Sequence, residues 1–135
     1  MKNWIIRSGF SLLIIFMICS CNKNWNDDFS MLTITIKDKN KNPVFLDDYF
    51  VINVNTGERM IDYDNYPDIY DISKRRGSYL LLTDDEIDRT TKKGTDCKFI
   101  GKINNAVIVE ENYTIGNNGR HVTILSGKKK IIANL

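Results

Sequence analysis

A segment in which apolar and polar residues alternate constrains the fold of this chain more than any other feature. In residues 31–37, Leu32, Ile34 and Ile36 occupy every second position, and a threonine or a lysine follows each of them. Successive side chains of a strand point to opposite faces, so this pattern predicts a strand that is buried on one side.

A second alternating segment, residues 50–55, predicts another strand. Its inward-facing residues are expected to be Phe50, Ile52 and Val54. Five further strand-like segments follow, and they are residues 78–83, 96–102, 106–115, 121–125 and 128–132. The last two are expected to pair as a closing hairpin across Ser126 and Gly127, because two-residue turns of this kind commonly join antiparallel strands.

The remaining segments lack a strand pattern. Residues 59–76 are rich in tyrosine and acidic residues, and Pro67 argues against a central strand there. Residues 84–89 predict one helical turn with acidic residues at its N-terminus. No amphipathic helix longer than two turns is expected. Residues 31–135 are therefore predicted to form an all-β domain, a single small antiparallel β-sandwich of about seven strands.

The N-terminal segment has the three parts of a secretory signal peptide. Lys2 and Arg7 give it a positive start, and residues 10–18 form an almost unbroken apolar run. This run is shorter than the roughly 20 apolar residues that a transmembrane helix needs. Residues 1–20 are therefore expected to be removed as a signal peptide.

The end of this segment, Ile18-Cys19-Ser20-Cys21, resembles the bacterial lipobox. The resemblance implies cleavage between Ser20 and Cys21, a diacylglycerol group on the Cys21 thiol and an acyl chain on the new amine. The lipid is then the only expected cofactor, and the membrane is a partner through this anchor, since several acyl chains hold a protein stably. Residues 21–30 would form a tether. The alternative is an ordinary secreted protein with two incidental cysteines.

Two features after the cysteine predict the address. Asn22 stands where an aspartate would resemble the inner-membrane retention signal, so the outer membrane is expected. Residues 26–28 (Asn-Asp-Asp) resemble the surface-export signals of Bacteroidetes lipoproteins, which favours the cell surface over the periplasmic face.

Cleavage also changes the composition of the chain. It removes two of the 19 basic residues and none of the 17 acidic ones, which leaves the mature domain without net charge. A nucleic-acid partner is not expected, because binding to phosphates requires a positive surface. Lys128, Lys129 and Lys130 are interpreted as a solvated strand edge. Cys97 is the one cysteine left unmodified, so no internal disulfide is possible, and a buried, inert thiol is predicted.

The segment comprising residues 32–37, the turn at residues 38–43, residues 50–55 and Thr56-Gly57 resembles carboxypeptidase-regulatory or transthyretin-like domains. The second half, with residues 101–105, residues 110–116, His121-Val122 and Ser126-Gly127-Lys128, resembles small Bacteroidetes lipoproteins of unassigned function. The resemblance implies an Ig-like sandwich in the cell envelope. Relatives often carry paired cysteines before the histidine, and Gly119-Arg120 stand there in this chain.

Catalytic and metal-binding residues are sparse. His121 is the one histidine, and it is interpreted as a packing or sheet-edge residue, so the chain is predicted not to be an enzyme. One histidine and one free cysteine fall short of a zinc site. Asp62, Asp64, Asp84 and Asp88 are weak calcium candidates, but their segments lack the glycine and glutamate of an EF-hand loop. Solvated acidic loops are the preferred interpretation.

A group of four tyrosines is the most suggestive feature for binding: Tyr63, Tyr66, Tyr70 and Tyr79. Such side chains suit protein or glycan surfaces, although they also cap the ends of sandwich cores. The sequence therefore predicts a lipid-anchored envelope module that binds or scaffolds an envelope protein or glycan. The alternatives are an envelope enzyme inhibitor or small hydrolase-associated domain, and a calcium-stabilised adhesion module.

Overall fold

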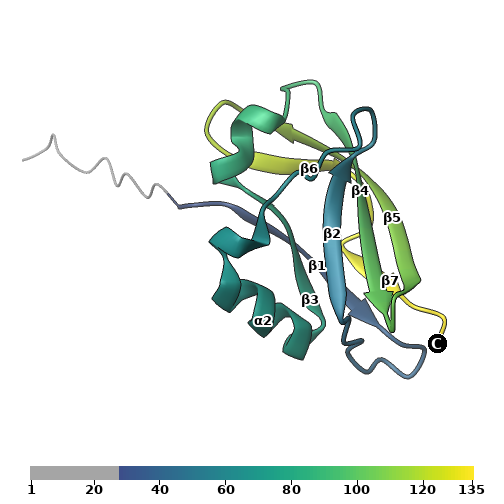
Figure 1. Ribbon diagram of the computed structural model, residues 1–135. Coiled ribbons are helices and arrows are strands. Elements are labelled where there is room, and N and C mark those ends of the chain that lie inside the picture. Colours follow the sequence, from purple (N-terminus) through teal and green to yellow (C-terminus); the bar gives the residue numbers. More distant parts are fainter. Residues whose placement is uncertain (1–27) are drawn as a thin grey trace, which may run out of the picture.

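The computed structural model describes residues 28–135, which fold into two facing β-sheets (Figure 1). The first sheet has the order β3-β1-β7, and its strands are β1 (Met31–Lys37), β3 (Ser78–Thr83) and β7 (Lys130–Ile132). The second has the order β2-β4-β5-β6, with β2 (Asp48–Asn53), β4 (Thr95–Ile103), β5 (Ala106–Asn117) and β6 (Val122–Ser126). The prediction of an all-β sandwich with seven strands is confirmed.

The hairpin expected at the end of the chain is not formed. β6 pairs antiparallel with β5 in one sheet, whereas β7 pairs parallel with β1 in the other. The segment between them crosses from sheet to sheet beside Tyr113, whose hydroxyl donates to Lys128 O at 2.6 Å. Gly127 lies directly against this ring with φ 126°, and a Cβ there would be 2.2 Å from Tyr113 Cδ1. Contact with Tyr113 therefore directs the turn across the sandwich, and the first sheet is mixed.

β2 presents the opposite face to that expected. Tyr49 and Val51 are fully buried between the sheets, while Phe50 and Ile52 are directed outward and Val54 is exposed. Both faces of this strand are apolar, so alternation alone could not select the inner one. The inner face contains Tyr49, whose ring packs against Tyr63, Tyr70, Tyr79 and Phe99.

Helices form within residues 59–76, where the sequence showed no periodic pattern of apolar residues. A 3-10 helix, η1 (Tyr63–Asn65), leads into α2 (Pro67–Arg76), which packs against β3 (Figure 1). With ten residues α2 is nearly three turns long, and it was not predicted, because the prediction of helices rested on an amphipathic pattern and residues 67–76 are mostly polar. Its end signals were present in the sequence: Pro67 at the first turn, basic residues in the last turn and Gly77 as a left-handed cap with φ 65°.

The helical turn predicted at residues 84–89 is confirmed as the 3-10 helix η2 (Asp84–Arg89). It begins with a capping box. Thr83 Oγ1 accepts from Asp85 N, and Glu86 Oε2 accepts from the backbone and the hydroxyl of Thr83. Glu86 is buried, so the hydrogen bonds of this box fix the connection between β3 and β4.

The core lies between the sheets and includes Ile34, Ile36, Leu80, Leu82 and Phe99, all almost fully buried. Cys97 is also fully buried, and burial, with a smaller contribution from Asp96, raises the pKa of its thiol to about 11. The predicted burial of this thiol is confirmed, and its low reactivity stays a prediction.

No helix within residues 28–135 has the length and hydropathy to cross a membrane. The predicted signal peptide, the cleavage site at Ser20 and Cys21, and the tether up to residue 27 lie outside the described residues.

Candidate functional site

The four predicted tyrosines do not form one surface. Tyr79 is fully buried and Tyr63 is 7 % exposed. Tyr79 donates to Val44 O at 2.6 Å, and Tyr63 donates to Leu80 O at 2.7 Å. Burial raises the pKa of both phenols. Inclusion of these two residues in a binding surface was wrong, because their rings fill the core and their hydroxyls bond to the backbone.

Tyr66 and Tyr70 are half-buried, and each is engaged within the fold. Tyr66 Oη donates to Asp85 Oδ2 at 2.6 Å, and Tyr70 Oη donates to Asp48 Oδ1 at 2.9 Å. The ring of Tyr70 stacks on Tyr49 at a centroid distance of 4.7 Å. Burial, followed by the hydrogen bond to an aspartate, raises the pKa of each phenol to about 12.

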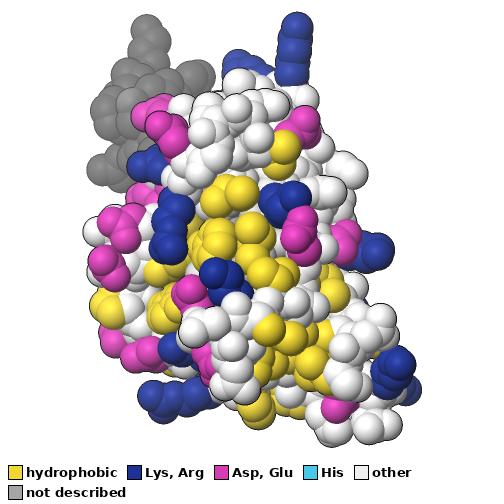
Figure 2. Space-filling view, turned by 45° about the vertical axis from the view of Figure 1, so that its right-hand side comes forward, with side chains coloured by type: hydrophobic (Ala, Val, Ile, Leu, Met, Phe, Trp, Pro, Cys, Tyr) yellow, Lys and Arg dark blue, Asp and Glu magenta, His cyan; other side chains and the backbone are white. Residues whose placement is uncertain are grey.

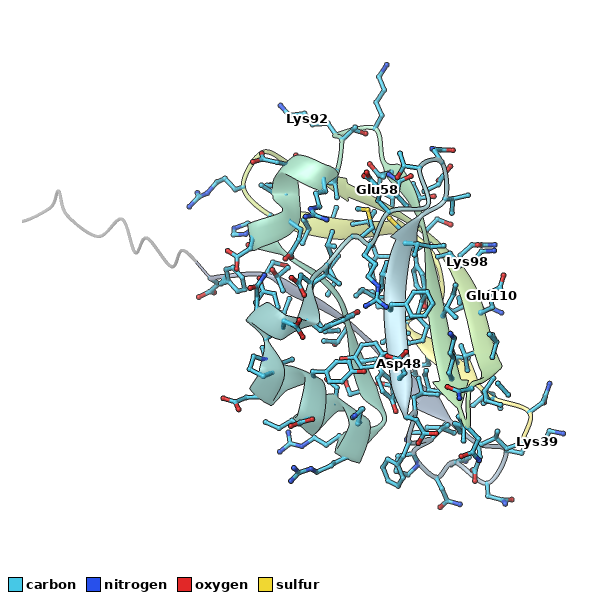
Figure 3. The ribbon with its side chains drawn as sticks, viewed as in Figure 1. Lys39, Asp48, Glu58, Lys92, Lys98 and Glu110 are labelled. Carbon is cyan, nitrogen blue, oxygen red and sulfur yellow. The ribbon has the colours of Figure 1, made fainter. Side chains whose placement is uncertain are left out.

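An acidic cleft of about 320 Å³ opens beside Tyr63 and Tyr70. Its charged lining residues are Asp48, Asp62, Asp64, Asp71 and Arg59. Asp48 lies on β2, as Figure 3 shows, and the other carboxylates come from η1 and its N-cap and from α2. Four carboxylates beside one guanidinium would favour binding of a cationic group. The sequence did not predict this cleft, because β2 and α2 are distant in the chain.

The calcium candidates are divided between two places. Asp62 and Asp64 line the acidic cleft, where Asp62 Oδ1 accepts from Asp64 N as the cap of η1. Asp84 is hydrogen-bonded to His121, Ser30 and Val122, and Asp88 is exposed on η2. Within residues 28–135, no group of three or more His, Cys, Asp or Glu side chains is placed to hold a metal ion.

Asp84 forms a cluster with His121, Ser30 and Val122 that the sequence did not reveal. Its carboxylate lies 2.7 Å from His121 Nδ1 and accepts from Ser30 N at 2.7 Å and Val122 N at 2.8 Å. Burial raises the pKa of Asp84, but the hydrogen bonds from His121, Ser30 and Val122 outweigh it, so that pKa lies below its usual value. Ser30, expected to belong to the tether, is thus held to β6 and η2.

This arrangement orients His121 but does not complete a catalytic set. A base in nucleophilic catalysis needs a nucleophile within hydrogen-bond reach. No hydroxyl or thiol within residues 28–135 forms a hydrogen bond to the His121 ring. The cluster therefore has a structural role: it joins the first described residues, at Ser30, to the start of η2 and to the start of β6.

The outer face of the four-stranded sheet is the most unusual surface of the domain. The cross-strand pairs of β2 and β4 place Phe50 beside Ile100 and Ile52 beside Lys98. Ile108 on β5 extends this apolar strip toward the edge of the sheet. Figure 2 shows the hydrophobic side chains gathered at the centre of this face, with charged side chains between and around them. The outer face of a sandwich strand is ordinarily polar.

The charges on this face are unevenly paired. Lys98 Nζ and Glu110 Oε1 lie 2.6 Å apart and are directed toward one another (Figure 3). Arg59 and Lys102 instead approach the ring of Phe50, with their charged groups 5.0 and 5.1 Å from its centroid. Neither cation forms an ion pair with a carboxylate within residues 28–135. The outer face thus combines an apolar strip with two cations that have no carboxylate of the described residues within ion-pair distance, although Arg59 also lines the acidic cleft.

Comparison with protein-family models, with curated proteins and with solved structures finds no match for this chain. The resemblance to carboxypeptidase-regulatory domains and to Bacteroidetes lipoproteins stays a prediction.

Proposed function

We propose that this protein is a lipid-anchored module of the bacterial cell envelope, without enzymatic activity, that binds an envelope partner through the outer face of its four-stranded sheet. One observation carries the binding part of the proposal: the half-exposed strip of Phe50, Ile52 and Ile100 on an outer sheet face, with the charged groups of Arg59 and Lys102 over the Phe50 ring. Contiguous apolar patches with a polar rim are typical of interaction sites, and aromatic residues and arginine are enriched at them.

The position of the chain's entry supports the same assignment. The described chain enters at the left of Figure 1, whereas β4 and β5 form the right-hand side of the molecule. An anchor at Cys21 would therefore be joined to the domain on the side opposite the outer sheet face. This geometry favours a protein or glycan partner over the membrane that holds the lipid.

The anchor is tested by metabolic labelling with radioactive palmitate in the native host or a related bacterium. The native chain and the matched control Cys19→Ser are expected to incorporate label and to fractionate with the outer membrane. Cys21→Ser is expected to lose both properties, because the thiol attacks the lipid donor. Equal labelling of Cys21→Ser and the native chain would refute the anchor. Protease treatment of intact cells then distinguishes the cell surface, where digestion is expected, from the periplasmic face.

The binding face is tested by a photo-crosslinking amino acid placed at Ile52 in living cells. A matched position is Arg75, exposed on α2 and remote from this face. A discrete adduct is expected from position 52 and none from position 75. Adducts of equal yield at both positions, or none at position 52, would contradict the proposal. The mature protein is also expected to show no turnover on a panel of hydrolase substrates, and activity that disappears in His121→Ala would contradict that part.

A further inference from the structure

Half of β5 has a free edge. β6 pairs with β5 only from Thr114 to Asn117, although β5 begins at Ala106. Within the described residues no strand pairs with residues 106–113 on the side away from β4. This half of β5 lies at the outside of the sandwich in Figure 1.

The hydrogen-bonding phase identifies which backbone groups face this edge. In an antiparallel ladder, alternate residues direct their backbone groups to opposite neighbours. Val54 N donates to Asp96 O at 2.9 Å, so the even-numbered residues of β4 face β2. The odd-numbered residues Cys97 and Phe99 then face β5, where they pair with Tyr113 and Glu111. The backbone groups of Glu110 and Asn112 consequently point to the free side.

A groove of about 470 Å³ adjoins this edge, between β5 and β7. Its buried lining is apolar and consists of Val109, Ile131 and Ala133. Ile132, also in the lining, is 58 % exposed. The free edge is therefore bordered by a cavity that apolar side chains of an added strand would enter.

The charges around the groove are also unbalanced. Glu110 is paired with Lys98, and Glu111 lies 3.9 Å from Lys128. The ammonium groups of Lys129 and Lys130 have no carboxylate partner within residues 28–135. A second copy that paired through the same edge would bring Glu110 and Glu111, which already have lysine partners, whereas a segment with free carboxylates would complement Lys129 and Lys130.

We propose that this edge binds an extended segment of a partner protein, which adds a strand to β5. The segment carries apolar residues at alternate positions, which enter the groove, and a net negative charge, which Lys130 in the groove lining and the neighbouring Lys129 favour. Backbone hydrogen bonds supply affinity in such strand addition, and alternate side chains supply specificity. The inference rests on the proposed function, because it names a partner for the same four-stranded sheet. The added strand would extend the outer face of that sheet beyond Ile108.

The probe is a fluorescent nine-residue peptide in which valine and glutamate alternate, added to the mature full-length protein in detergent. The expected result is saturable binding by fluorescence anisotropy, with slowed hydrogen exchange at the Glu110 amide. N-methylation of the peptide's edge-facing amides removes backbone donors and retains the side chains, so a loss of about tenfold or more in affinity is expected. Lys130→Glu is expected to weaken binding several-fold, and Lys92→Glu, in a loop at the other end of the domain (Figure 3), is expected to leave it unchanged.

Absence of binding, equal binding of the N-methylated peptide, or an unaffected Glu110 amide would overturn the inference. Sedimentation of the protein alone as a dimer, with the Glu110 amide already protected, would also overturn it and assign the edge to a second copy. The proposed function is refuted by a different set of results. Loss of the palmitate label or of the adduct at position 52, with peptide binding retained, would refute it and leave this inference standing.

Discussion

Replacing Asp84 by asparagine is expected to destabilise the domain strongly for a single residue near the surface. The carboxylate accepts hydrogen bonds from two backbone amides and pairs with His121 Nδ1, all within 2.8 Å. A hydrogen bond to a charged group contributes about 1.5–3 kcal/mol. The three interactions share one carboxylate and are not additive. Asparagine also turns an NH₂ group toward one of the donors, so a loss of about 2–4 kcal/mol in the free energy of unfolding is expected.

The effect is measured by urea denaturation followed by far-ultraviolet circular dichroism. Asp88→Asn is the matched control, because Asp88 is exposed on the same 3-10 helix and its side chain forms no hydrogen bond or ion pair within the described residues. It is expected to change stability by less than about 0.5 kcal/mol. Equal effects of the two substitutions would refute the role assigned to the Asp84 cluster.

The same substitution predicts a dependence on pH. The pKa of Asp84 is lowered in the folded state, so its contribution is complete above the unfolded-state value of about 3.9. That contribution is lost as the pH falls through the lower folded-state pKa. The difference between the native chain and Asp84→Asn should therefore shrink as the pH falls below 4. A difference that is unchanged at pH 3 would contradict the hydrogen-bond assignment.

Three further predictions follow from single sites. Gly127→Ala is expected to cost more stability than Gly119→Ala, by about 1–3 kcal/mol, since both have positive φ but a Cβ contacts Tyr113 only at position 127; equal melting temperatures would contradict this. Cys97 should react with a thiol reagent only after denaturation, because its thiol is fully buried with a pKa of about 11, and rapid labelling of the native protein would oppose that view. Millimolar calcium should leave the melting curve unchanged, as residues 28–135 gather no metal-ligand cluster, and an increase of several degrees would revive a calcium site.

Local patterns predicted much of the fold. β1 followed from its alternation, and the turn at η2 from its acidic N-terminus. α2 was missed because its exposed residues are mostly polar and its apolar residues form no continuous stripe, although Pro67 and Gly77 marked both ends. The placement of β7 depends on pairing with β1, about 95 residues earlier, which no local pattern reports.

The candidate sites were harder to predict, because they depend on packing between distant segments. Tyr79 and Tyr63 are amphipathic side chains that suit a surface or a core, and only the position of Tyr49 decides between them. Asp84 and His121 come into contact because β6 is an edge strand of its sheet and its first residues lie beside η2. The outer face was missed for a related reason: the apolar residues Phe50 and Ile52 were assigned to the core.

The outer sheet face is tested most directly by reversing its unpaired charges. Arg59→Glu combined with Lys102→Glu leaves the buried residues unchanged, and the fold is checked by circular dichroism. The yield of the adduct formed from position 52 is expected to fall at least tenfold in this variant and to stay unchanged in Lys92→Glu. A folded double variant that retains the full yield would contradict the assignment of this face as the binding surface.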